Sequence, residues 1–108
     1  MEIRNATKKD LLEIVKMLAD DELGKTREVF ADPLPDHYLK AFDEIQIQGG
    51  TEIFVAVEAE QIIGCFQLTF IANLSRGGML RAQIEGVRVH KDHRGKRVGA
   101  ALIKDAIA

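Results

Sequence analysis

The chain has 108 residues, of which 46% are hydrophobic and 30% are charged, and its formal net charge is −2. A chain of this length forms one domain, and its composition excludes disordered and collagen-like proteins. The slightly acidic balance also argues against a general nucleic-acid-binding protein.

Nothing in the sequence predicts export or membrane insertion. Residues Met1–Asn5 lack the basic and then apolar pattern of a signal peptide. No apolar run reaches the roughly 20 residues that a membrane helix needs. Cys65 is the single cysteine, which excludes an internal disulfide. We therefore expect a cytoplasmic protein with no membrane partner.

The first half of the chain predicts a short strand and two helices. Residues 2–5 suit a strand. Thr7, with Asp10 three residues later, is a helix-start signal, and apolar residues at helical spacing predict a helix to about Asp20. The polar segment 19–34 predicts a loop or a broken helix. Pro35 opens a second helix, and the glycine pair at 49–50 ends it.

The second half predicts strands and a last helix. Residues 53–57 and 62–72 are rich in β-forming side chains and predict a hairpin, and residues 80–90 predict a third long strand. Helical spacing resumes at Gly95. The inward-facing residues there are predicted to be Val98, Ala101, Leu102 and Ile107.

This order predicts an α/β fold of the α+β type, with a mixed, mainly antiparallel sheet flanked by helices. A doubly wound dinucleotide-binding fold is disfavoured, because strands and helices do not alternate and no G-x-G-x-x-G pattern occurs.

The segment between the third long strand and the last helix suits an anion. Residues 88–97 carry a charge of +4, while the remaining residues carry −6. Gly95 and Gly99 stand where the helix begins, and a helix start offers N–H groups and the positive end of its dipole. Arg94, Lys96 and Arg97 would add positive charge. From the residues alone, a phosphate cradle and an ordinary turn with packing glycines both remain open.

The same segment resembles the GNAT superfamily of N-acetyltransferases, whose signature is Arg/Gln-x-x-Gly-x-Gly/Ala after a strand and at a helix start. The chain has Arg94-Gly95-Lys96-Arg97-Val98-Gly99 in that context. The predicted order of elements is similar to the N-terminal half of the family's acyl-CoA N-acyltransferase-like fold. The resemblance implies transfer of an acetyl group from acetyl-CoA to a primary amine of a small molecule or peptide, by direct attack on the thioester, without a metal.

The resemblance also implies roles for individual residues. Glu85 would be the catalytic base, acting on the amine through water. Main-chain groups of Val87 and Val89 would hold the pantetheine arm like an added strand, and the Val87 N–H would face the developing oxyanion. The implied cofactor-binding residues are Val87, Arg88, Val89, Arg94, Gly95, Lys96, Arg97, Val98, Gly99 and Ala100.

The third long strand predicts an irregularity. Val87 and Val89 share one parity, and Ile84 has the other. A bulge near Gly86 would turn all three toward the core. The family has a bulge in this strand.

Two features depart from the family pattern. Arg97 stands at the motif's first glycine, where its side chain either crowds the diphosphate or adds a contact to a phosphate. The sequence also stops inside the motif helix, so we expect residues 1–108 to be a single, incomplete N-acetyltransferase domain. The resulting open sheet edge predicts a homodimer or a swapped oligomer. The alternatives are a CoA-binding module without turnover and a structural fragment that dimerises through its sheet.

Other reactive side chains suit structural roles. His90 and His93 lack further ligands at metal-site spacing, and Cys65 lies in an apolar strand. Acidic residues at 20–22 lie where the family's first two helices line the acceptor side, as do Glu28, Phe30 and Tyr38. Acidic groups there would suit a cationic amine.

Overall fold

The computed structural model describes residues 1–20, 24–94 and 98–107. A 3₁₀ turn, Lys8–Asp10, precedes the first helix, and a second one, Lys91–His93, follows the last strand. The strands are β1 (Glu2–Asn5), β2 (Thr51–Glu58), β3 (Gln61–Ala72) and β4 (Leu80–Val89). The helices are α1 (Leu11–Ala19), α2 (Gly24–Arg27), α3 (Asp36–Gln48), α4 (Ser75–Gly78) and α5 (Val98–Ile107).

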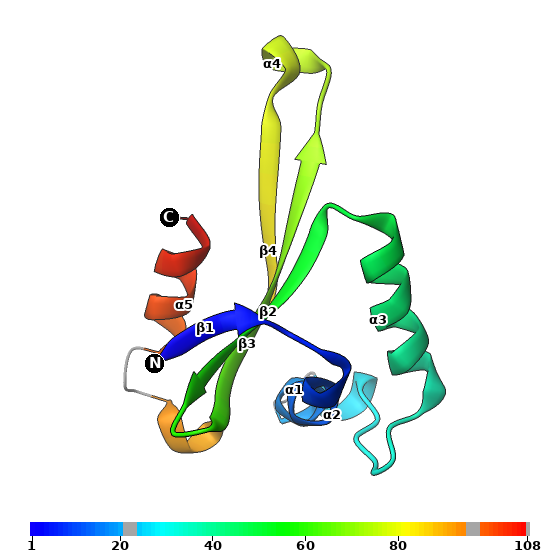
Figure 1. Ribbon diagram of the computed structural model, residues 1–108, viewed down its shortest axis with the longest axis vertical. Helices are drawn as coiled ribbons and strands as arrows, with labels where there is room; N and C mark the ends of the chain where they lie inside the picture. Colours follow the sequence, from blue (N-terminus) through cyan, green and yellow to red (C-terminus); the bar gives the residue numbers. More distant parts are fainter. Residues whose placement is uncertain (21–23, 95–97, 108) are drawn as a thin grey trace.

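The strands of the described residues form one antiparallel sheet in the order β1-β2-β3-β4. Helices α1 and α3 cover one face of the sheet, and α5 covers the other (Figure 1). The predicted α/β class and the predicted order of long elements are confirmed. Short α2 lies inside the segment for which a loop or a broken helix was predicted.

Both faces of the sheet are apolar, which explains why β2 has a continuous apolar run. Successive side chains of a strand point to opposite faces. Val55 accordingly packs in the cluster under α1 and α3, while Ala56 packs in the cluster under α5. In α5, Val98 and Leu102 are buried and Ala101 is half-buried, as predicted. The prediction for Ile107 lies outside the described side chains.

The predicted bulge is present in β4. Cys65 pairs with Arg88 and Gln67 with Glu85, so Gly86 and Val87 both lie opposite the single residue Phe66. Gly86 has φ 62°, the left-handed conformation that glycine adopts at little cost.

The bulge decides which side chains of β4 reach the core. Ile84, Val87 and Val89 all pack against the cluster under α5, although regular alternation would place Ile84 on the opposite face from the two valines. The sequence-based hypothesis about this strand is therefore confirmed.

The start of the first helical segment depends on one buried carboxylate. Asp10 is 6% exposed. Its Oδ2 accepts hydrogen bonds from the Thr7 backbone N–H at 2.7 Å and from the Thr7 hydroxyl at 3.1 Å. Both carboxylate oxygens also accept from Arg4 of β1, at 2.8 and 3.1 Å. The Arg4 hydrogen bonds are the largest cause that lowers the pKa of Asp10.

Helix α5 lies very close to the sheet at Gly64. A Cβ atom at this position would lie 3.0 Å from Leu102 Cδ1 and 3.2 Å from the Arg88 carbonyl oxygen. The contact leaves room for a hydrogen and little more. It seats α5 over the central strand β3.

The β3–β4 hairpin extends beyond the rest of the molecule (Figure 1). Its outer part, capped by the irregular turn α4, exposes Phe70, Leu74 and Leu80. The shorter β2–β3 hairpin turns at Ala59 and Glu60, which have φ 51° and 65°. These positive φ values are those of the type I′ turn that two-residue hairpins favour, although neither residue is Asn or Gly.

We predict that Asp10→Asn lowers the free energy of unfolding at pH 7 by about 1–3 kcal/mol, since Arg4 and Thr7 lose their charged acceptor. Because folding lowers the pKa of Asp10, its stabilisation is complete above the unfolded-state pKa and is lost as pH falls through the native value. The difference between wild type and variant should therefore shrink below about pH 4. Urea unfolding at several pH values measures it.

Asp43→Asn is the matched control for this carboxylate. Asp43 pairs with Lys8 at 3.0 Å, but both side chains are at least half exposed. Its removal should cost less than about 1 kcal/mol. Equal losses in the two variants would contradict the role assigned to Asp10.

We predict opposite effects of alanine at two glycines of the β4–α5 segment. Gly86→Ala should destabilise the chain by about 1 kcal/mol, because a Cβ has room there, 3.9 Å from Leu18, but φ is left-handed. Gly99→Ala should be neutral or stabilising by up to about 1 kcal/mol, because its Cβ would make ordinary contact with Val89 inside a helix. Thermal unfolding of both variants tests this, and a stabilising Gly86→Ala would refute the strained bulge.

Candidate functional site

The predicted site residues gather where β4 ends and the chain passes through Lys91–His93 toward α5. Along the chain, this region begins at the bulge at Gly86 and ends at the first turn of α5. Glu85, Val87, Arg88, Val89, Arg94, Val98, Gly99 and Ala100 are described by the structure, and Gly95, Lys96 and Arg97 lie outside the described residues.

The main-chain groups of Val87 and Val89 point away from β3. The His90 N–H donates to the Ile63 carbonyl at 2.8 Å, so His90 faces β3 with its main chain. Main-chain direction alternates along a strand, so Val89 and Val87 face the outer edge of the sheet. β4 is an edge strand of the described sheet. Its outer side can therefore accept an extended ligand as an added strand.

Two arginine side chains hold the carbonyl groups on this edge. Arg88 Nη1 donates to the Val87 carbonyl at 3.0 Å, and Arg94 Nε donates to the Val89 carbonyl at 3.1 Å. The edge therefore presents its N–H groups to a ligand with two of its carbonyls already paired. This polarity suits acceptor groups of a ligand, such as an amide or thioester carbonyl.

Arg94 also connects the motif to the end of α1. Its Nη2 donates to the Asp20 carbonyl at 3.1 Å and lies 3.5 Å from the Asp20 carboxylate. The same guanidinium therefore joins β4 to the residue that follows α1. The prediction that Arg94 also contacts a phosphate stays a prediction, and its guanidinium would have to serve that phosphate while held by these protein partners.

The first turn of α5 is the predicted place of main-chain contacts to an anion. Val98 is buried against the sheet, while Ala100 is exposed. The N–H groups of Val98, Gly99 and Ala100 have no carbonyl four residues earlier within the helix. Since a Cβ at Gly99 would make only ordinary contact with Val89, packing does not require glycine there.

Glu85 lies on the other side of the bulge. It pairs with Gln67 of β3 and shares the α1-facing side of the sheet, opposite to Ile84. Its carboxylate is exposed and accepts a hydrogen bond from the Gln83 side-chain amide. An exposed carboxylate beside the bulge can take a proton from an amine directly or through water.

Cys65 is a core residue, as predicted. It is 2% exposed, and burial raises the pKa of its thiol to about 11. Its Sγ lies 3.7 Å from the Gly86 carbonyl oxygen. A thiol with this pKa holds almost no thiolate at neutral pH and is inert as a nucleophile.

Tyr38 is tied to the segment after α2. Its hydroxyl donates to Glu28 at 2.8 Å and accepts from the Val29 N–H at 2.9 Å. Burial is the largest cause that raises its pKa. The hydroxyl thereby links α3 to the residues just before Phe30.

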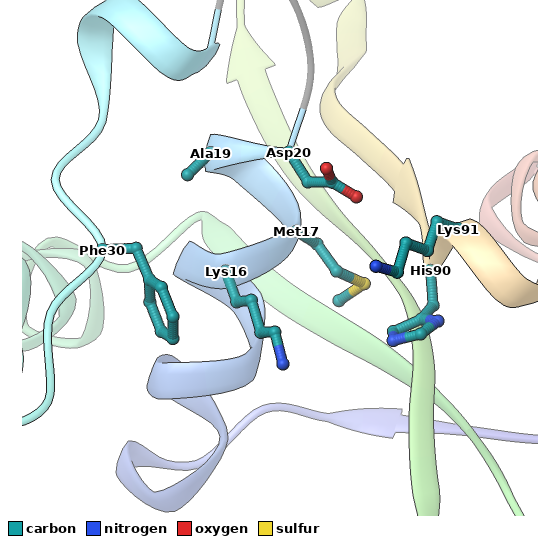
Figure 2. Close-up of a pocket in the computed structure, with 7 residues that line it drawn as sticks. All are labelled: Lys16, Met17, Ala19, Asp20, Phe30, His90 and Lys91. Atoms are coloured by element: carbon teal, nitrogen blue, oxygen red, sulfur yellow. The ribbon is translucent and has the colours of Figure 1, made fainter.

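A pocket that the sequence did not predict lies between the end of α1 and the end of β4 (Figure 2). Its volume is about 270 Å³. Its walls combine apolar and basic side chains from three separate segments. They are Lys16, Met17, Ala19, Asp20, Phe30, His90 and Lys91.

Among the residues that the structure describes, the predicted acidic acceptor side is only partly assembled. Asp20 and Phe30 do line the pocket, but Asp20 lies against Arg94, and Glu28 is engaged by Tyr38. Asp21 and Glu22 lie outside the described residues. Within the described residues, no three His, Cys, Asp or Glu side chains are grouped as a metal site would need. No helix in that part of the chain is long and apolar enough to cross a membrane.

Comparisons with known proteins give the family of the chain. The model of the acetyltransferase (GNAT) family matches residues 14–108. Comparison with curated protein sequences gave no significant match.

Solved structures share the fold over nearly the whole chain. A transcriptional regulator from Bacillus halodurans C-125 is 46% identical, with 98% of this chain and 71% of that chain covered and a TM-score of 0.93. An acetyltransferase from Trypanosoma brucei is 27% identical, with coverage of 98% and 71% and a TM-score of 0.74. A predicted acetyltransferase with acetyl-CoA from Clostridium acetobutylicum is similar in fold, with 16% identity, coverage of 98% and 70% and a TM-score of 0.71.

These similarities confirm the acyl-CoA N-acyltransferase-like fold, and the family match covers most of the sequence, including the Arg94–Gly99 motif. The chain therefore belongs to the GNAT family of acetyltransferases.

Proposed function

We propose that the chain moves an acetyl group from acetyl-CoA to a primary amine of a small molecule or peptide. The observation that carries this proposal is the bulge at Gly86, because it sets the valine side chains in the core while their main-chain N–H groups face an open edge. We infer that residues 1–108 act as one domain in the cytoplasm. The net charge of −2 does not favour a nucleic-acid partner.

The residues of this region fit acetyl-CoA in three places. Val87 and Val89 would bind the pantetheine arm through their main chains, beside Arg88. The first turn of α5, Val98 to Ala100, would hold the diphosphate through N–H groups and the helix dipole. Arg94, Gly95, Lys96 and Arg97 would complete the anion site between these two places. When bound, acetyl-CoA supplies the activated thioester.

Glu85 is the proposed catalytic base. An amine attacks only through its free lone pair, so its proton must leave before or during attack. Glu85 lies beside the bulge and would take this proton through water. The Val87 N–H would donate to the carbonyl oxygen as negative charge develops on it. No metal is needed for either role.

The alternative is a CoA-binding module without turnover. It is favoured by Arg97, which replaces the first glycine of the family motif, and by the exposure of Glu85 to solvent. Both proposals share the cofactor site, so binding and turnover must be measured separately.

We predict that acetyl-CoA stabilises the chain against heat, by ~2.7 kcal/mol at a hundredfold excess over Kd. Mixing with a panel of amines should then release free thiol. Glu85→Gln should keep the thermal shift and lower the rate of thiol release by roughly 10²–10⁴-fold, as expected for loss of a general base.

Glu58→Gln, an exposed position at the end of β2, is the matched control and should change neither quantity. A thermal shift without thiol release from the wild type would favour the binding module. No shift at all would leave only a structural role.

We also propose that the chain forms a homodimer or a swapped oligomer through the outer edge of β4 near Leu80, away from the Val87–Val89 stretch that would hold the pantetheine arm. The support is that β4 ends the sheet of the described residues and that Phe70 and Leu80 beside this edge are exposed. Sedimentation should show association that increases with concentration. A strictly monomeric species at high concentration would refute it.

A further inference from the structure

We propose that the pocket between α1 and the end of β4 binds a carboxylate or phosphate group of the acceptor, so that amines carrying an anionic group are the preferred substrate class. This inference rests on the proposed acetyltransferase function. It differs from the expectation that acidic residues on this side would suit a cationic amine.

The charge of the pocket supports an anion. Lys16 from α1, Lys91 from the turn after β4 and the His90 ring line the same pocket (Figure 2). Asp20 is the acidic residue among the described lining side chains, and its carboxylate lies 3.5 Å from Arg94 Nη2. Arg94 balances this charge, so among the described lining residues the two lysines give the pocket its positive charge.

The remaining walls favour a small organic group over a bare ion. Met17 is 3% exposed and forms an apolar part of the lining, and the Phe30 ring forms another. His90 Nδ1 accepts a hydrogen bond from the Asp92 N–H at 3.2 Å. A neutral His90 therefore carries its proton on Nε2 and adds a donor to the lining. Apolar walls with a few donors are the usual composition of a small-molecule site.

The pocket lies on the same face of the sheet as the proposed base. Val87 and Val89 point toward α5, so Arg88 and His90 point toward α1, as does Glu85. Leu18 lies 3.9 Å from the position of a Cβ on Gly86, and the preceding residue, Met17, lines the pocket. Bulge and pocket are therefore adjacent beneath the last turn of α1.

The spacing sets the length of a suitable acceptor. His90 follows Val87 by three residues, which corresponds to roughly 10 Å along a strand. An acceptor with its amine at the bulge would bring an anionic group into the pocket if a chain of about this length separates the two. An ω-amino acid as long as 6-aminohexanoate approaches this length, whereas shorter ones do not.

The phosphates of CoA are the other source of an anion. The first turn of α5, which would hold the diphosphate, packs on the opposite face of the sheet from α1. The pocket instead opens between α1 and β4, on the side of Glu85. This separation assigns the pocket to the acceptor.

A pair of acceptors of equal length tests the proposal. Thiol release from acetyl-CoA is measured with 6-aminohexanoate and with 6-amino-1-hexanol, which differ in charge at one end. We expect kcat/KM to be at least about tenfold higher for the acid, as one charge-assisted hydrogen bond would give. The preference should decrease with added salt.

Lysine variants locate the effect. Lys16→Met and Lys91→Met keep an unbranched apolar stem and remove the charge, and both positions are exposed, so folding should be unaffected. Each should reduce the preference for the acid toward one, mainly through a higher KM. Lys40→Met, on the exposed side of α3, is the control and should keep the wild-type preference.

Binding provides a readout that does not require turnover. Calorimetric titration of the CoA-saturated chain should show tighter binding of 6-aminohexanoate than of the alcohol, with the difference lost in both lysine variants. Equal binding and equal rates for the two acceptors would overturn the inference and leave the acetyltransferase proposal intact. Weaker acetyl-CoA binding by the lysine variants would overturn it too, because the pocket would then serve the cofactor. Failure of acetyl-CoA to bind the wild type would reject both proposals.

Discussion

The left-handed backbone at Gly86 is the constraint on which the site depends. β4 must contribute apolar side chains to the cluster under α5 and also leave main-chain groups at its outer edge. A regular strand cannot place Ile84, Val87 and Val89 on one face. One extra residue opposite Phe66 restores the phase after Ile84, and glycine provides the φ of 62° that this needs. The contribution of β4 to the core and the direction of its main-chain groups after the bulge therefore depend on the same residue.

A second contact extends this arrangement to the helical side of the sheet. Arg94 donates to the carbonyl groups of Val89 and Asp20, which belong to segments that are far apart in the sequence. A planar guanidinium with several fixed donors can hold two such groups at once. It thereby fixes the distance between the end of β4 and the end of α1. The pocket lies between these two ends, so its shape depends on the same guanidinium that begins the family motif.

Much of the fold could be predicted from the sequence, because its signals are local. Apolar periodicity located the long helices and strands, and the parity of three apolar residues located the bulge. The spacing of Thr7 and Asp10 also predicted their contact. The contact of Asp10 with Arg4 could not be predicted, because β1 meets the helix only in the folded chain. The turn at Ala59–Glu60 has no sequence signature, since strand pairing on either side imposes its positive φ values.

The pocket could not be predicted either, because its walls come from segments that are far apart in the sequence. Lys16 and His90 are each ordinary surface candidates until tertiary packing brings them together.

The close contact at Gly64 has a consequence for the whole helical layer on that side. Leu102 lies directly over the place that a Cβ of Gly64 would occupy. The absence of this atom therefore allows α5 to pack close to the sheet. A Cβ at this position would lie 3.0 Å from Leu102 Cδ1 and 3.2 Å from the Arg88 carbonyl oxygen, so both neighbours would have to move by a few tenths of an ångström. The displacement would be small, but it would affect the helix whose first turn carries the N–H groups of the proposed anion site. Gly64 has no functional group, yet its lack of a side chain sets how closely α5 packs on β3.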